Sequence, residues 1–282
     1  MSCAATNAFY RGDFALGRRL SSEALREGVV EGCPFPMMIY SAPAVFSRPG
    51  ELPGLLTAGL AALETVDAPE WDVAGLRAAM AGMAAIEGEL QLAEAESAAA
   101  LTIGRRLNSP AIVTTALYAH ALACSQSQPA TALTALEEYF EIVRSGVGTQ
   151  VLARCHALAA QLRAATGDLT GALDDLRLAI GTAHGTGDRP AMAFALSRTV
   201  FVLCSNDSTT AAVLSGAIDR GDLQRLFPVL QWERGWLQRV TDELRTELGD
   251  DRYQAAVDRG IALPYDDAVA TAVDAIGALV DR

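Results

Sequence analysis

Six short turn-forming sequences recur along this chain at almost constant spacing. The first is Gly12-Asp13-Phe14 and the last is Asn206-Asp207-Ser208. Their starting residues are Gly12, Gly50, Gly88, Ser127, Gly167 and Asn206, separated by 38, 38, 39, 40 and 39 residues. A domain with a single core has no reason to repeat a turn at fixed intervals. The spacing therefore predicts an array of similar structural units.

Small side chains occupy equivalent places after most of these turns. Five positions after the turn start, the residue is Gly or Ala in five of six units, with Leu55 as the exception. Seven residues further on, it is Ala in four of six, and Tyr139 and Ile218 depart. The small residues are Gly17, Ala93, Ala132, Ala172 and Ala211, and then Ala24, Ala62, Ala100 and Ala179. Because small side chains let two helices approach closely, the pattern predicts stacked helical pairs.

The segments between the turns have the periodicity of amphipathic helices. Ala, Leu, Arg and Glu dominate them, and these residues favour helix. Apolar residues recur at three- and four-residue spacing, without the alternation typical of strands. The expected helices cover Trp71–Ile86, Leu90–Leu107, Ala111–Cys124, Ala130–Val143, Gln150–Ala165 and Thr170–Ala183. We therefore expect an all-α protein made of successive helical hairpins.

The turn and the small residues resemble the skeleton of the tetratricopeptide repeat (TPR), whose usual period is about 34 residues. Lengthened units of this kind resemble the C-terminal regions of large actinobacterial ATPase regulators, which are joined to LuxR-type or adenylate-cyclase-like domains. The passages that carry this second resemblance are Leu101–Pro110, Ala211–Ala217, Glu247–Tyr253, Gly260–Leu263 and Asp266–Val269. The resemblance implies a right-handed α-solenoid of about six TPR-like hairpins in residues 1–221. Capping helices in residues 222–282 would cover its last hairpin.

Charge and composition argue against several function classes. The chain has 34 acidic and 22 basic residues, all of the latter arginine, and a net charge of −12. It would repel a phosphate backbone, so direct nucleic-acid binding is not expected. The absence of lysine removes Walker A and Schiff-base chemistry. The five cysteines never form C-x-x-C and no apolar run reaches about 18 residues, so a cytoplasmic protein without a membrane span is expected.

Catalytic and metal-binding motifs are weak in this sequence. It contains no H-E-x-x-H, G-x-S-x-G or G-x-G-x-x-G pattern, so no catalytic residue and no cofactor is expected. His120 and Cys124 could form a metal cluster with Cys155 and His156 of the next unit. However, adjacent residues on a helix point about 100° apart, which disfavours this cluster. We interpret these side chains as packed, with a ligand-pocket role for His120 as the alternative.

Acidic pairs and tryptophans are assigned structural roles. Asp174 and Asp175 lack the spacing of a calcium loop, and we expect them on a solvated outer face. Trp71 is expected to pack at the start of its helix. Trp232 and Trp236, four residues apart, are expected to belong to the apolar face of a capping helix rather than to an aromatic ligand box.

The TPR resemblance places a binding groove on the first helix of each hairpin. The side chains at these positions are mostly apolar, with Arg154 as the single charge, which suits an amphipathic partner helix or an apolar small molecule. A neighbouring helix of the same protein filling the groove is the alternative. The expected groove residues are Met37, Tyr40, Thr114, Leu117, His120, Ala121, Cys124, Arg154, Gln161, Leu196 and Val200.

The expected function is a non-enzymatic regulatory or protein-interaction module of a transcriptional or signalling regulator. Its concave groove would bind a partner helix or domain. A small-molecule effector sensor that uses the same groove is the alternative, and an enzyme is a distant third. The sequence has no nucleotide-binding loop, cyclase motif or basic helix-turn-helix, so the ATPase and output functions of the regulators are not expected of these residues.

Overall fold

The computed structural model describes residues 4–5, 7–8, 11, 13–31, 50–146, 151–219 and 233–281. Within these ranges every regular element is a helix and no strand occurs, which confirms the expected all-α class. None of the described helices is both long and apolar enough to cross a membrane.

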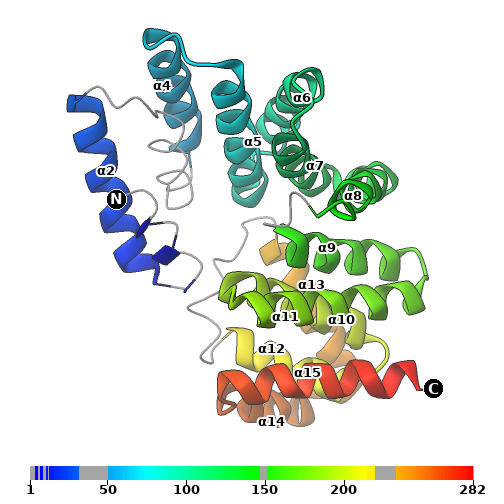
Figure 1. Cartoon of the computed structure of the whole chain (residues 1–282). Coiled ribbons are helices and arrows are strands. Elements are labelled where there is room, and N and C mark those ends of the chain that lie inside the picture. Colours follow the sequence, from blue (N-terminus) through cyan, green and yellow to red (C-terminus); the bar gives the residue numbers. More distant parts are fainter. Residues whose placement is uncertain are drawn as a thin grey trace. The chain divides into compact units, whose positions relative to one another are not determined.

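The chain divides into two compact units, Met1–Gln150 and Val151–Arg282. The first contains α2 (Phe14–Glu31), α4 (Leu52–Thr65), α5 (Glu70–Glu87), α6 (Leu90–Arg106), α7 (Pro110–Cys124) and α8 (Pro129–Val143) (Figure 1). The second contains α9 (Leu152–Ala165), α10 (Leu169–Thr186), α11 (Arg189–Cys204), α12 (Ser208–Asp219), α13 (Glu233–Leu248), α14 (Asp250–Ile261) and α15 (Tyr265–Val280). The expected boundary at 221/222 falls within the second unit, outside the described residues.

The repeated turns separate helices as the sequence predicts. Gly88 and Gly167 have φ angles of 83° and 87°, in the left-handed region that glycine tolerates at the end of a helix. After the second of these turns, the Asp168 carboxylate accepts a hydrogen bond from the backbone N–H of Gly171 at 2.9 Å. This contact caps α10, because it satisfies one of the backbone donors that a helix start leaves unpaired.

The helices of the first unit pack in an alternating order. α5 contacts both α6 and α7, and α7 in turn contacts α6 and α8. The small residues predicted to lie between helices are buried here: Ala93, Ala100 and Ala132 have no exposed surface. These three alanines therefore belong to the packed interior of the first unit.

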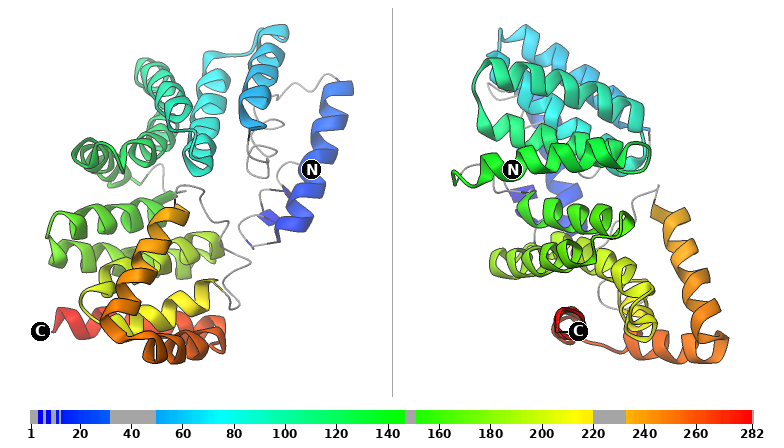
Figure 2. Two further views of the ribbon diagram at one scale, coloured as in Figure 1. Left: turned by 180° about the vertical axis from the view of Figure 1, so that it is seen from behind. Right: turned by 90° about the vertical axis from the view of Figure 1, so that its right-hand side faces the viewer.

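The second unit repeats this order and then departs from it. α9 contacts α10 and α11, and α11 contacts α10 and α12. α12 then packs along α14, while α15 contacts α10, α11 and α12 (Figures 1 and 2). Gly216 and Gly260 allow the close approach of α12 and α14. A Cβ atom on Gly260 would lie 1.8 Å from the carbonyl oxygen of Val213, and one on Gly216 would lie 2.3 Å from that of Val257.

Trp71 does not pack into the protein as expected. Its side chain is 46% exposed on the first turn of α5, so this expectation is wrong. Trp232 lies outside the described residues, as does the side chain of Trp236.

Candidate functional site

The expected groove positions of the first unit lie mostly on α7. Thr114, Leu117, Ala121 and Cys124 are all buried, none more than 2% exposed. α7 contacts α5, α6 and α8, so neighbouring helices surround it. These four side chains therefore present almost no surface to solvent in the described structure. Met37 and Tyr40, the other expected groove residues of this unit apart from His120, lie outside the described residues.

His120 is half-buried and makes two polar contacts. Its Nδ1 atom lies 3.3 Å from Oγ of Ser97 on α6, and its Nε2 atom lies 3.7 Å from Sγ of Cys124. Burial, followed by the negative charge of Glu94, raises the pKa of the Cys124 thiol. The thiol is therefore protonated near neutral pH and a poor nucleophile. Within the described ranges, no three or more His, Cys, Asp or Glu side chains are placed to hold a metal ion.

The expected groove positions of the second unit have two different environments. Leu196 and Val200 on α11 are buried, at 0% and 2% exposed. Arg154 on α9 is paired instead: its Nη2 atom lies 3.0 Å from the carboxylate of Asp188. The side-chain oxygen of Gln161 is buried and accepts no hydrogen bond from the described residues. The single charge of the expected groove is thus held by a carboxylate of the same protein.

Asp188 makes two stabilising contacts, one with Arg154 and one with the start of α11. Besides pairing with Arg154, it caps α11 by accepting the backbone N–H of Ala191 at 2.9 Å. Asp188→Ala is expected to lower the free energy of unfolding by about 2 kcal/mol, because it removes a helix cap and a nearly buried partner of a guanidinium group. Urea denaturation measures this change.

The matched control is Asp13→Ala. The Asp13 carboxylate accepts the backbone N–H of Leu16 at the start of α2, at 3.1 Å, and makes no ion pair with the described residues. Its loss should cost about 1 kcal/mol. Equal costs for the two variants would show that the ion pair of Arg154 adds no stability.

A buried charged cluster between α9 and α10 was missed by the sequence analysis. Asp175 is only 3% exposed, so its expected place on a solvated face is wrong. Its carboxylate lies 2.7 Å from Nδ1 of His156 and also pairs with Arg163. The helical spacing could have predicted this burial. Asp175 stands three residues after Ala172 and four before Ala179, on the face that both alanines bury. An acidic residue on that face needs partners, and α9 supplies them.

Arg198 on α11 was also missed, although it has no exposed surface. Its Nη1 atom donates a hydrogen bond to Oγ of Ser197 at 2.9 Å. The guanidinium group lies 4.0 Å from the ring centroid of Phe194, in a cation–π arrangement. No sequence motif marks this arginine, since its burial depends on how the rest of the second unit surrounds α11.

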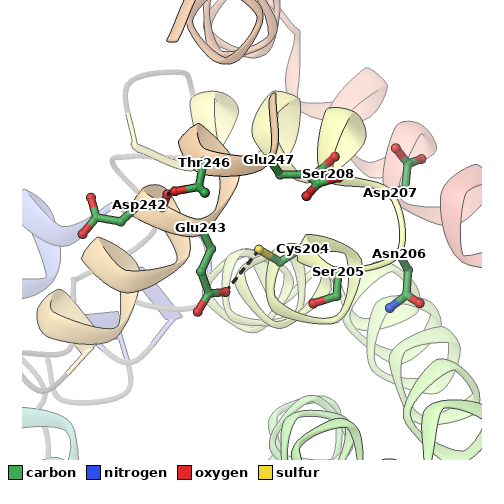
Figure 3. Close-up of a pocket in the computed structure, with 9 residues that line it drawn as sticks. All are labelled: Cys204, Ser205, Asn206, Asp207, Ser208, Asp242, Glu243, Thr246 and Glu247. Atoms are coloured by element: carbon green, nitrogen blue, oxygen red, sulfur yellow. Dashed lines mark hydrogen bonds between the residues drawn. The ribbon is translucent and has the colours of Figure 1, made fainter. Parts of the chain in front are cut away.

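An open polar pocket lies in the second unit, where the end of α11 and the start of α12 face α13 (Figure 3). Its volume is about 650 Å³, within the range of small-molecule sites. The described lining residues include four acidic ones and no basic one, so the pocket favours a cation. They are Cys204, Ser205, Asn206, Asp207, Ser208, Asp242, Glu243, Thr246 and Glu247.

Cys204 and Glu243 form the direct contact across this pocket. The Cys204 thiol donates to a carboxylate oxygen of Glu243 at 3.6 Å, as the dashed line in Figure 3 shows. Burial, and then the charge of Glu243, raise the pKa of this thiol from 9.0 to about 11. Cys204 is therefore a hydrogen-bond donor at physiological pH rather than a nucleophile.

The raised pKa predicts slow alkylation of Cys204. With iodoacetamide at about pH 8, Cys204 should react more slowly in the folded protein than after unfolding in urea, because the thiolate is the reactive form. Glu243→Gln should speed the reaction in the folded protein, since it removes a charge that opposes ionisation. Mass spectrometry of the alkylated peptides measures both rates. An unchanged rate in Glu243→Gln would contradict the contribution of this carboxylate.

No protein-family profile matches this chain, and a search of curated proteins finds none that is detectably similar. Function is therefore inferred from the sequence pattern and from the geometry above.

Proposed function

We propose that this chain is a non-enzymatic protein-interaction module of a transcriptional or signalling regulator. The observation that carries the proposal is the alternating contact order, in which α5 packs on α6 and α7, and α9 packs on α10 and α11. Together with the repeated turns, this order supports a TPR-like array. Arrays of this kind present long surfaces to other polypeptides, because each hairpin buries only its contacts with its neighbours.

The proposed architecture is a right-handed solenoid of about six hairpins. The packing of α14 and α15 against α12 supports a capping role for the C-terminal helices. Such a cap covers the apolar face that the last hairpin would otherwise expose. The partner of the module is a protein helix or a domain of the parent regulator, as the resemblance to actinobacterial ATPase regulators implies.

Partner binding in this proposal uses the outer side chains of the helices and their connections. Leu117 and Leu196 are too deeply buried to contact a partner without local unfolding. Binding a partner through side chains that are already exposed does not require local unfolding.

Affinity purification of the tagged protein from the cells that produce it tests this function. We expect a polypeptide that co-elutes in a fixed molar ratio and binds again after both components are purified separately. If the protein instead retains only small molecules, which native mass spectrometry detects, the interaction-module proposal is wrong.

The acidic pocket favours a second candidate, a sensor of a small cationic effector. Four carboxylates line a volume of about 650 Å³ at the junction of α11, α12 and α13. An effector that binds there would raise the melting temperature, because it stabilises only the folded state. Spermidine is the probe, and the double variant Glu243→Gln/Glu247→Gln should abolish the shift. Glu137→Gln, which alters an exposed carboxylate on α8, is the control.

A further inference from the structure

Three exposed apolar side chains belong to the helix connections at one end of the first unit. Val66 follows α4, Trp71 is the second residue of α5, and Leu107 follows α6. Their exposed fractions are 44%, 46% and 39%, and they make up half of the large apolar side chains that are exposed in the described parts of the chain. Single exposed apolar residues are ordinary, but three at connected helix ends, with a tryptophan among them, mark a candidate interaction surface.

The antiparallel packing of α5 and α6 brings these residues to the same end. Glu70 precedes Trp71 and Arg106 precedes Leu107, and the carboxylate and guanidinium of Glu70 and Arg106 lie 2.7 Å apart. Val66 joins the same end through the short connection 66–69. We use the name Trp71 surface for Val66, Asp67, Trp71, Asp72 and Leu107.

The charge at this end is predominantly negative. Asp67 and Asp72 stand on either side of Trp71 in the sequence, and among the described residues neither carboxylate has an ion pair or a side-chain hydrogen bond. Arg106 already donates a hydrogen bond to Glu70. This hydrogen bond lowers the pKa of the Glu70 carboxyl group. The two aspartates are thus free to bind a positive charge.

We propose that the Trp71 surface binds a cationic segment of a partner protein, one that carries arginine or lysine side chains beside apolar ones. A guanidinium or ammonium group stacks on the indole ring of Trp71, and the carboxylates of Asp67 and Asp72 hold its charge. Apolar side chains of the segment cover Val66 and Leu107. This inference rests on the proposed interaction function and specifies the surface and the partner chemistry.

Charge complementarity selects this occupant over a second copy of the chain. Two copies that met through this surface would bring their unpaired aspartates together, and each chain carries a net charge of −12. Like charges in contact oppose association. A basic segment instead gains attraction from the same carboxylates, and it approaches faster at low ionic strength.

A labelled peptide tests the proposal on the full chain. The probe is a fluorescein-labelled peptide of about 14 residues with leucine and arginine at helical spacing, and a second peptide carries glutamate in place of arginine. Fluorescence anisotropy measures the affinity. We expect the arginine peptide alone to bind, and Trp71→Ala to weaken binding about tenfold or more. Trp71→Phe, which keeps an aromatic ring, should retain an intermediate affinity.

Matched charge variants separate this site from general attraction to an acidic protein. Asp67→Asn/Asp72→Asn should weaken binding, whereas Asp266→Asn/Asp267→Asn on α15 removes the same charge and should not. Asparagine at residue 67 tolerates the positive φ angle of 49° found there. Leu178→Ala, which removes another exposed apolar side chain, should also leave the affinity unchanged.

Three results would overturn the inference: no binding of the arginine peptide, equal binding of the glutamate peptide, or equal effects of the two aspartate pairs. Circular dichroism of each variant checks that folding is retained. Failure of the proposed function itself gives a different result, because the affinity purification then yields no stoichiometric polypeptide. A captured partner that binds Trp71→Ala as tightly as the unchanged protein would contradict the surface alone.

Discussion

Replacing Leu196 by aspartate is expected to unfold much of the second unit. Leu196 has no exposed surface on α11, a helix that contacts α9, α10 and α12. The substitution removes a buried aliphatic side chain and places a carboxylate in its position without a designed partner. Together these effects should cost more than about 4 kcal/mol. Circular dichroism at increasing urea concentrations measures the loss.

Leu178→Asp is the matched control for this change. Leu178 lies on α10 of the same unit and is 52% exposed, so its replacement should change the free energy of unfolding by less than about 0.5 kcal/mol. If Leu196→Asp instead keeps its helical signal and stability, α11 has an accessible face, and the groove expected from the sequence is open. Leu117→Asp applies the same test to the first unit.

Gly260→Ala is expected to cause the second large loss of stability. A single added methyl group would lie 1.8 Å from the carbonyl oxygen of Val213 on α12, far inside van der Waals contact. The obstacle is backbone, so no side-chain rotation can relieve it and α12 and α14 must separate. We expect a cost of about 3 kcal/mol or more, visible as a lower urea midpoint.

Gly277→Ala distinguishes this steric effect from the general effect of replacing glycine. Gly277 also lies in a helix, α15, but a Cβ atom there would meet nothing within 4 Å. That substitution should stabilise the protein slightly, by about 0.5–1 kcal/mol, because alanine favours helix more than glycine does. Gly216→Ala should resemble Gly260→Ala. Equal effects at residues 260 and 277 would contradict the close helix contact.

The helices and their turns followed from local sequence, because these features depend on residues near each other in the chain. The helix expected over Leu90–Leu107 is observed as Leu90–Arg106, and the one expected over Trp71–Ile86 as Glu70–Glu87. The positive φ angle of Gly88 and the capping of α10 by Asp168 are properties of short segments. The spacing of apolar residues identifies such helices directly, and the residue types at the turns identify where they end.

The candidate sites could be predicted far less well. The TPR resemblance assigned groove positions by counting back from each turn, but counting cannot show how completely neighbouring helices cover Thr114 or Val200. The acidic pocket brings Cys204 next to Glu243, 39 residues later in the chain. A contact over that separation depends on how α13 packs on the preceding helices, which no local pattern encodes.

The sequence by itself determined that this protein is helical and where the turns between its described helices lie. Only the tertiary structure decided that Asp175 is buried against His156 and that Trp71 is exposed. The physical reason is that helix periodicity identifies an apolar face without specifying what covers it. Asp175 lies on a face that α9 covers and supplies with charged partners, whereas Trp71, on the first turn of α5, is left about half exposed.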